Sequence, residues 1–229
     1  YLLDEAMLAQ VSTEEKRQYI GASAIGEACA RHIQYDLFDT PRDPGRERTA
    51  ANLRLCQRGH LFEPVMAGWL QQAGFVLQTV DDQGRQFGFA MAGGRIRGHI
   101  DGIIIGGPKG FCYPCLWENK VLSSKAWKLL AKSRLALAKS VYAAQVALYQ
   151  AYLGLHAHPA LFTALNADSM EIHVEWVAFD AALAQSASDR AVQVLQASEA
   201  RELLPRLSRE RTFHECKLCP WQDRCWGQP

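Results

Sequence analysis

The feature that most constrains the fold is a pair of apolar, strand-like segments joined by a glycine-rich turn. Residues 95–105 and 111–121 both have the composition of β-strands, and Gly-Gly-Pro-Lys-Gly separates them. Such a hairpin pairs its strands antiparallel. Each apolar run carries charge, with Asp101 in the first strand and Glu118 and Lys120 in the second. Because strand side chains alternate, Glu118 and Lys120 are expected on one face.

The carboxylates of this hairpin predict a cation site. An ionised carboxylate in an apolar strand is costly unless it is paired or binds a cation. If the hairpin brings Asp101 and Glu118 onto one face, the two groups, with carbonyl and water oxygens, suit Mg²⁺ or Mn²⁺. Lys120 would then orient or deprotonate a water, or balance charge on a phosphate. The alternatives are a solvent-facing aspartate at a strand end and a surface ion pair.

The rest of the pattern predicts a mixed α/β (α+β) fold, with a mixed central sheet flanked by helices. A helix start is expected at residues 12–15, from Ser-Thr-Glu-Glu. Helices are expected over residues 1–40, 49–73, 124–139, 141–153 and 180–203, and further strands over 75–80, 86–92, 161–166 and 171–179. We divide the chain into an N-terminal helical segment (1–48), a core (49–205) and a C-terminal cysteine tail packing with the N-terminal segment (206–229).

Size and charge narrow the function classes. The 229 residues fit one large domain, or a core with one appendage. With 25 basic and 24 acidic residues, overall charge predicts no nucleic-acid binding, so any such binding must come from local clustering. No apolar stretch approaches the roughly 20 residues of a membrane helix, and no secretion leader is recognised. We therefore expect a cytoplasmic protein with no membrane partner.

Two polar pairs stand at helical spacing. His60 and Glu63 are three residues apart, and Gln145 and Tyr149 are four apart, so each pair shares a helix face. Taken alone, His60 is an ordinary helix histidine and the second pair is the polar fringe of an amphipathic helix. Taken in order, the set G-H-x-x-E, G-H-I-D-G, E-N-K and Q-x-x-x-Y resembles the RecB-like branch of the PD-(D/E)XK nuclease superfamily. The resemblance covers about residues 20–226.

The resemblance implies a restriction-endonuclease-like PD-(D/E)XK core and a metal-dependent DNA nuclease. In that family the histidine, the aspartate and the glutamate bind the metal, which places these roles on His60, Asp101 and Glu118. The residue between the glutamate and the lysine lends its backbone carbonyl to the metal, and here that residue is Asn119. The implied cofactor is Mg²⁺ or Mn²⁺.

The same resemblance gives roles to the other motif residues. It implies that Lys120 is catalytic and that Gln145 and Tyr149 support the site and the DNA. Glu63 fits this pattern less closely. The implied reaction is hydrolysis of a phosphodiester bond, in which a metal-generated hydroxide attacks and the developing charge on the phosphate is neutralised.

The cysteine tail indicates a second metal centre. Seven cysteines without a leader favour metal or cluster ligation over disulfides. Cys216, Cys219 and Cys225 form C-x2-C-x5-C, whose three thiolates hold one face of a centre and leave a fourth ligand to come from elsewhere. The RecB-like nucleases with an iron–sulfur cluster, including CRISPR-associated Cas-four-type nucleases and related phage exonucleases, show this tail and a fourth cysteine near the N-terminus. Cys29 fits that place, so the resemblance implies a 4Fe-4S cluster that acts as a structural staple. Zn²⁺ or free buried thiols are the alternatives.

The remaining cysteines are not called for by the resemblance. Cys112 and Cys115 form a second C-x2-C just before Glu118. If the strand is regular there, alternation puts Cys112 on the Glu118 face and Cys115 on the other. We interpret the pair as a turn with buried thiols, with half of a zinc site as the alternative. Cys56 is expected in the core.

A basic segment offers a path for DNA. From Asn119 to Lys139 there are six basic residues and no acidic one. The stripe that we predict on one helix face, with Trp127 nearby to stack a base, consists of Lys125, Lys128, Lys132 and Lys139. Phosphate contacts from such a stripe are salt-dependent and independent of sequence. The alternative is a solvated helix face and a core tryptophan.

Together these patterns favour a Mg²⁺- or Mn²⁺-dependent DNA exonuclease that acts on single-stranded or frayed DNA ends. CRISPR adaptation, phage recombination and DNA repair all fit, with adaptation or recombination proteins as partners besides DNA. The alternative is a non-catalytic DNA-binding or scaffold protein that keeps the fold and the cluster. The intact set of Asp101, Glu118 and Lys120 favours the enzyme, because a scaffold has no need of it.

Overall fold

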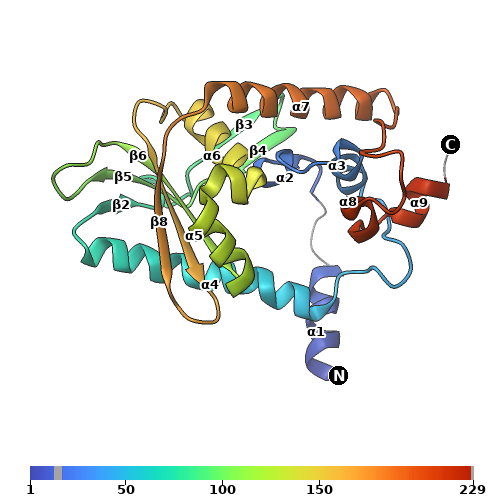
Figure 1. Ribbon diagram of the computed structural model, residues 1–229, viewed down its shortest axis with the longest axis horizontal. Coiled ribbons are helices and arrows are strands. Elements are labelled where there is room, and N and C mark those ends of the chain that lie inside the picture. Colours follow the sequence, from blue (N-terminus) through green and yellow to red (C-terminus); the bar gives the residue numbers. More distant parts are fainter. Residues whose placement is uncertain (13–16, 228–229) are drawn as a thin grey trace.

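The computed structural model describes residues 1–12 and 17–227, and Figure 1 shows their course. The helices are α1 (Leu2–Ser12), α2 (Ala22–Ile25), α3 (Ala30–Leu37), α4 (Ala50–Gln72), α5 (Ser124–Ala138), α6 (Ser140–Tyr152), α7 (Ala181–Glu199), α8 (His214–Leu218) and α9 (Gln222–Gly227). The strands are β1 (Ile20–Gly21), β2 (Val76–Gln78), β3 (Gly88–Met91), β4 (Ile96–His99), β5 (Gly102–Gly106), β6 (Cys115–Leu122), β7 (Ala160–Asn166) and β8 (Ile172–Val177). Ser12 ends α1, and the rest of the helix start expected there lies outside the described residues.

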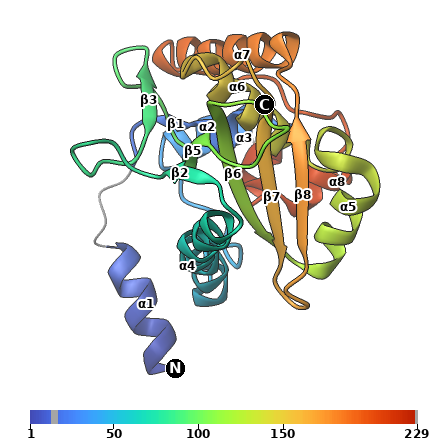
Figure 2. The ribbon, with the colours of Figure 1, turned by 90° about the vertical axis from the view of Figure 1, so that its left-hand side faces the viewer.

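Two sheets organise the core. The larger has the order β2-β5-β6-β7-β8, and the smaller has the order β1-β4-β3. In the larger sheet β6 and β7 run parallel while the other neighbours are antiparallel, so the sheet is mixed. Figure 2 shows β6, β7 and β8 side by side, with α4 and α5 on either side of them. The predicted mixed sheet flanked by helices is therefore confirmed.

Strand β6 shows how the alternation of its side chains builds two faces. Its even-numbered apolar residues, Leu116 and Leu122, pack in one cluster with side chains of α5 and α6. Its odd-numbered residues Cys115 and Trp117 pack in another cluster with Met66 and other side chains of α4. Glu118 and Lys120 share the parity of Leu116, so the period-2 pattern assigns them to the α5/α6 face.

The prediction of one continuous strand over 95–105 is wrong. The segment divides at Ile100 and Asp101 into β4, which pairs with β1 and β3, and β5, which pairs with β2 and β6. At the break, the Asp101 carboxylate accepts a hydrogen bond from the Asn119 backbone N–H, with 2.6 Å between the oxygen and the nitrogen. The Asp101 side chain thus binds the backbone of β6 at the point where the chain leaves one sheet and enters the other. The apolar pattern of the sequence does not predict this break.

Helix α4 follows its prediction closely. Thr49 caps its start, where the Asn52 backbone N–H donates to the Thr49 hydroxyl in a capping box. Gly74, at φ +92°, follows its end, a conformation that favours glycine. Cys56 lies exposed on this helix, so its expected place in the core is wrong. Among the described residues, no helix combines the length and the apolar character that a membrane crossing requires.

Helix α5 departs from the continuous helix that we expected over 124–139. Arg134 has φ 64° and ψ 169°, which breaks the helix at that residue. The carboxylate of Glu175 on β8 is buried there: it accepts from the Leu135 backbone N–H at 3.0 Å and from the Arg134 side chain at 3.2 Å. The break is thus fixed by a contact some 40 residues away in sequence.

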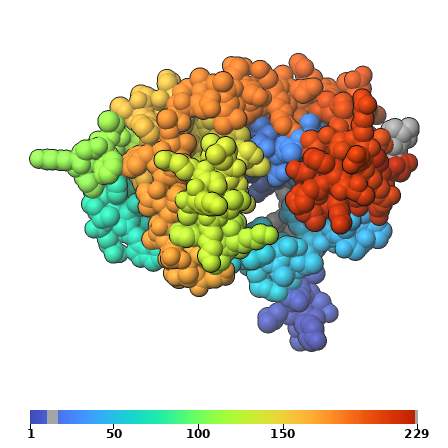
Figure 3. Space-filling view, in the orientation of Figure 1, coloured from blue at the N-terminus to red at the C-terminus, as the bar shows by residue number. Residues whose placement is uncertain are grey.

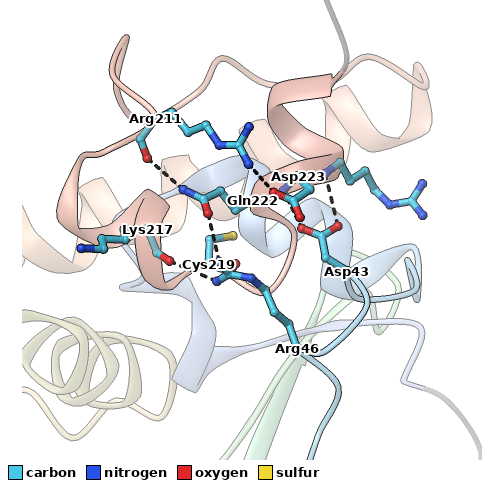
Figure 4. Close-up of polar contacts among 8 residues, drawn as sticks. Asp43, Arg46, Arg211, Lys217, Cys219, Gln222 and Asp223 are labelled. Carbon is cyan, nitrogen blue, oxygen red and sulfur yellow. Dashed lines mark hydrogen bonds and ion pairs between the residues drawn. The ribbon is translucent and has the colours of Figure 1, made fainter.

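The C-terminal tail packs on the N-terminal part of the chain. Trp221 is 1% exposed and donates its indole N–H to the Thr40 carbonyl. Figure 4 shows further polar contacts of the tail: the buried Asp43 accepts from the backbone N–H groups at the start of α9. Arg46 donates to the carbonyls of Lys217 and Cys219. These contacts join the two ends of the described chain without using a thiol.

Asp43→Ala tests this attachment. The change leaves two amide groups of α9 without their acceptor, which costs about 1–3 kcal/mol. We expect hydrogen exchange at the tail amides to accelerate roughly 10-fold or more. Asp82→Ala, which removes an exposed carboxylate in a turn, is the matched control and leaves tail exchange unchanged. Equal exchange in both variants would show that Asp43 does not hold the tail.

Candidate active site

The β5–β6 hairpin brings the two predicted carboxylates together. Its antiparallel register pairs Gly102 with Trp117 at the end of the ladder, so the same register continued by one position places Asp101 opposite Glu118. The charge of Asp101 raises the pKa of Glu118, which reflects the proximity of the two groups. The proposed hairpin is therefore confirmed as a structural unit, and Asp101, directly before β5, lies within electrostatic range of Glu118.

Glu118 is the most deeply buried ionisable group of this cluster. Its side chain is 1% exposed, and burial raises its pKa to about 8, with the Asp101 charge adding to the shift. Oε1 accepts a short hydrogen bond from the Lys120 ammonium, whereas Oε2 is buried without a hydrogen-bond partner. A buried carboxylate oxygen without a partner is costly, so it marks a place suited to a cation.

Lys120 bridges the acidic groups and helix α6. Burial alone would lower the pKa of Lys120, but the Glu118 and Asp101 carboxylates raise it above its usual range. Its ammonium therefore stays charged at neutral pH. The ammonium also lies 5.4 Å from the centre of the Tyr142 ring, a cation–π distance.

Helix α4 contributes the two residues of the G-H-x-x-E motif. Burial raises the pKa of Glu63 to about 7, and the Asp101 charge adds to the rise. His60 is exposed, and its charge lowers the pKa of Asp101, although burial raises that pKa overall. Both residues thus lie within electrostatic range of Asp101. Glu63, which the family pattern fits less closely, makes a third carboxyl group in this cluster.

Gln145 and Tyr149 form a buried pair on α6. The Gln145 amide donates to the Tyr149 hydroxyl at 2.8 Å, and burial raises the pKa of Tyr149, with Glu118 adding to the rise. Gly98, in the G-H-I-D-G motif, explains how the tyrosine fits. A Cβ at Gly98 would lie 2.5 Å from the Tyr149 ring, so only glycine leaves room for it.

The predicted basic stripe is only partly continuous. Lys125, Lys128 and Lys132 are exposed on α5. Lys139 follows the break at Arg134, so helical spacing no longer relates it to the other three, and its ammonium lies 6.0 Å from the centre of the Tyr142 ring. The predicted single stripe of four lysines is wrong at that position.

Trp127 belongs largely to the core. Its side chain is half-buried against the cluster beneath α5 and donates its indole N–H to the Ala164 carbonyl at 2.9 Å. These surroundings match the alternative prediction of a core tryptophan. Its expected role in base stacking stays a prediction.

The four cysteines of the predicted cluster line one cavity. Cys29 precedes α3, Cys216 and Cys219 lie at α8, and Cys225 lies in α9, and all four border a space of about 230 Å³. Burial raises the pKa of Cys216, and the neighbouring Cys29 and Cys225 thiols add to the rise. The cavity is large for a single ion, and histidine and glutamate residues line it beside the four cysteines.

The other C-x2-C pair is arranged differently. β6 begins at Cys115, so strand alternation does not extend to Cys112, which is exposed in the preceding loop. Cys115 is buried on the α4 side, as its parity predicted, and burial raises its pKa to about 11. Only one of the two thiols is buried.

The residues present can be compared with the cofactors that the resemblance implies. In the described part of the chain, no three histidine, cysteine, aspartate or glutamate side chains stand close enough to hold one metal ion as they are placed. Mg²⁺ needs only one or two carboxylates because it keeps several waters, and Asp101 with the unpartnered Glu118 oxygen supplies these. In an iron–sulfur cluster each thiolate binds a different iron, so the four sulfurs need not converge on one point.

The comparisons with known proteins bear on the fold. No family model matches the sequence, and no curated protein matches it significantly. The crystal structure of an alkaline exonuclease from Laribacter hongkongensis is similar, with a TM-score of 0.53 and 17% identity over 86% of this chain and 93% of that one. The same exonuclease in complex with dAMP gives a TM-score of 0.52 and 14% identity over the same shares. The likeness shows a shared fold, and the mixed α/β core is compatible with the predicted PD-(D/E)XK class.

Sequence reasoning missed two residues, one beside this cluster and one at the break in α5. Tyr142 contacts Lys120, and its spacing of three residues before Gln145 was an available signal. Glu175 fixes the break in α5, and no local pattern in the sequence marks that contact.

The raised pKa of Glu118 gives a pH prediction for the metal-free protein. The folded state binds this proton more tightly than the unfolded state, in which a glutamate titrates near its ordinary 4.5. The stabilising contribution is complete below about pH 4.5 and is lost as pH rises toward 8. We expect the melting temperature in EDTA to fall across that range, and Glu118→Gln, which cannot titrate, to flatten the fall.

The control for this measurement is Glu171→Gln, which changes an exposed glutamate in the β7–β8 turn. It should follow the parent curve. A Glu118→Gln curve that falls as steeply as the parent curve would mean that Glu118 does not titrate in this range.

Proposed function

We propose that the chain is a metal-dependent DNA nuclease with its active site at Asp101, Glu118 and Lys120. The observation that carries the proposal is the buried, unpartnered Oε2 of Glu118. Glu118 lies on the same strand face as the half-buried Lys120, and the hairpin register, continued by one position, places it opposite Asp101. Such an arrangement carries a desolvation cost, because the ion pair with Lys120 leaves Oε2 without a partner. It becomes favourable when a divalent cation neutralises the carboxylates.

Asp101 and Glu118 would hold Mg²⁺ or Mn²⁺, together with the Asn119 backbone carbonyl. His60 on α4, the third side chain that the resemblance implies, would have to move closer to join them, because no three such side chains of the described residues converge as placed. A bound divalent ion supplies a nucleophilic hydroxide at neutral pH and charge neutralisation at the phosphate. The Asn119 backbone N–H orients the Asp101 carboxylate by a hydrogen bond of 2.6 Å. Glu63 lies near enough to sense the Asp101 charge and completes the acidic cluster.

Lys120 acts as a cation in this proposal. Its pKa lies above the usual range because of the two neighbouring carboxylates, so the amine keeps its proton at neutral pH. A protonated lysine orients the attacking water and stabilises negative charge on the phosphate, and it is not suited to remove a proton. Of the roles that we considered for Lys120, charge balance and water orientation are therefore preferred. Gln145 and Tyr149 support this face from α6.

The substrate that we propose is DNA with a free, single-stranded or frayed end, cut as by an exonuclease. The fold is shared with an alkaline exonuclease, one of whose structures is a complex with dAMP. Helix α5, with exposed Lys125, Lys128 and Lys132, supplies positive charge for phosphates. Figure 3 shows the molecule hollowed between α5, α4 and the cysteine tail, which gives a strand room to approach. CRISPR adaptation, recombination and repair are processes that consume such ends.

We also propose that Cys29, Cys216, Cys219 and Cys225 bind a 4Fe-4S cluster, with Zn²⁺ as the alternative. The shared cavity of about 230 Å³ supports a cluster over a single ion. The Arg31 guanidinium, 3.7 Å from the Cys225 sulfur, would balance part of the negative charge of four thiolates. The cluster would then staple α3 to the tail, beside the contacts of Asp43 and Arg46.

Digestion of labelled DNA tests the nuclease. We expect the parent protein to degrade single-stranded oligonucleotides with Mg²⁺ or Mn²⁺ and to stop in EDTA. Asp101→Asn and Lys120→Ala should each lower the rate about 100-fold or more, as expected for loss of a catalytic group. Lys109→Ala, which removes an exposed lysine in the β5–β6 turn, is the control for charge.

Two results would contradict this proposal. Digestion by Asp101→Asn and Lys120→Ala at the parent rate would remove these residues from the active site. A folded parent protein that binds DNA but does not cut it with either metal would favour the scaffold alternative.

Anaerobic purification tests the cluster. We expect brown protein with about four iron and four sulfide per chain. Cys219→Ser should lose most of the iron, whereas Cys56→Ser, which changes an exposed thiol outside the cavity, should keep it. Colourless protein with stoichiometric zinc would contradict the cluster and support the zinc alternative.

A further inference from the structure

A tyrosine between two lysines adjoins the candidate active site and is not part of the motifs above. The Lys120 ammonium lies 5.4 Å from the centre of the Tyr142 ring, and the Lys139 ammonium lies 6.0 Å from the same centre. Both distances are within the range of cation–π interactions. One aromatic ring therefore gathers two positive charges from different parts of the chain.

The position of Tyr142 on α6 relates it to the buried pair on that helix. Tyr142 precedes Gln145 by three residues and Tyr149 by seven, so the three side chains lie on one helix face. Lys120 lies beside Tyr142, and Tyr149 contributes, after the carboxylates, to the raised pKa of Lys120. The face of α6 that carries Gln145 and Tyr149 thus extends by one turn to Tyr142, whose ring lies beside the Lys120 ammonium.

The break in α5 is what brings Lys139 to this ring. In an unbroken helix, Lys139 would follow Lys125 by fourteen residues and lie close to the same outer face. The positive φ of Arg134, next to the buried Glu175, interrupts the helix, so residues after it no longer continue the same helical spacing. Lys139 then caps the junction of α5 and α6, and its ammonium lies beside Tyr142.

The two lysines differ in their charge balance. Lys120 forms an ion pair with Glu118. Among the described residues, no carboxylate forms an ion pair with Lys139. Two cations on one ring repel each other, and a neighbouring anion relieves that repulsion. The charge that Lys139 leaves uncompensated is therefore suited to an anionic ligand such as a phosphate.

We propose that Tyr142 is a positioning residue that holds Lys120 toward Glu118 and Lys139 toward the DNA backbone, where Lys139 binds a phosphate next to the one that is cut. The proposal rests on the proposed nuclease function and adds to it a residue that sets the geometry of its lysine. It separates Lys139 from the outer lysines of α5, which bind DNA farther along the strand.

Steady-state kinetics on a single-stranded oligonucleotide test the two roles separately. Tyr142→Leu should lower kcat about 10-fold, because Lys120 loses the ring that holds it, while Tyr142→Phe keeps the ring and should stay within about 2-fold of the parent. Lys139→Ala should raise KM about 5-fold and leave kcat near the parent value, as for loss of a ground-state phosphate contact. Lys109→Ala is the charge control.

A binding measurement without metal keeps the inference separate from activity. In EDTA, the affinity for a labelled single-stranded oligonucleotide is measured across a salt series by fluorescence anisotropy. Lys139→Ala should reduce the slope of log affinity against log salt by about 0.7, the value for one phosphate contact on a single strand. Lys109→Ala should keep the parent slope, and Tyr142→Leu should lie between the two.

The outcomes distinguish this inference from the proposed function. If the parent cuts DNA and Tyr142→Leu matches it in kcat, the positioning role of Tyr142 is overturned. If Tyr142→Phe is as slow as Tyr142→Leu, the hydroxyl rather than the ring matters, and the inference as stated fails. If Lys139→Ala keeps the parent salt slope, Lys139 binds no phosphate. A parent that cuts no DNA overturns the proposed function, and the metal-free salt slopes still decide the role of Lys139.

Discussion

The burial of Glu118 is the constraint on which the rest of the candidate site depends. A carboxylate 1% exposed, with one oxygen paired to Lys120 and the other without a partner, is stable only if its surroundings are arranged for it. Strand β6 lies inside the larger sheet between β5 and β7, so its backbone is held on both sides. The neighbouring elements then bring Asp101 from one side and helix α6 from the other. The geometry of the cluster follows from that central position.

Two glycines show how closely the elements around this cluster approach. Gly98 leaves room for the Tyr149 ring, and Gly102 lies where a Cβ would be 2.8 Å from the Gln78 carbonyl oxygen. Both belong to the G-H-I-D-G motif, in which Asp101 stands between Gly98 and Gly102. The motif therefore places a carboxylate between two positions at which a side chain would collide with neighbouring residues. Its spacing is explained by packing as much as by chemistry.

Much of this arrangement was predictable from local patterns, and the rest was not. Period-2 alternation in β6 predicted that Glu118 and Lys120 share a face, and the glycine-rich turn predicted the hairpin to β5. The division of the expected strand at Asp101 was missed because apolar runs on both sides of it look continuous, while the partner that diverts it, Asn119, is eighteen residues away. The break at Arg134 was missed for a similar reason, since Glu175 lies on another strand. Local periodicity predicts elements well, but contacts between distant residues decide where they bend.

The position of Asp101 between two sheets has a consequence for how this cluster responds to change elsewhere. Asp101 lies in neither ladder: β4 before it belongs to the smaller sheet, and β5 after it belongs to the larger one. The position of its carboxylate relative to Glu118 therefore depends on how the two sheets are oriented, as well as on the hydrogen bond from the Asn119 backbone N–H. A slight rotation of the smaller sheet relative to the larger one would shift Asp101 relative to Glu118. Substitutions in β1 or β3, remote from the carboxylates, would then change the distance between them.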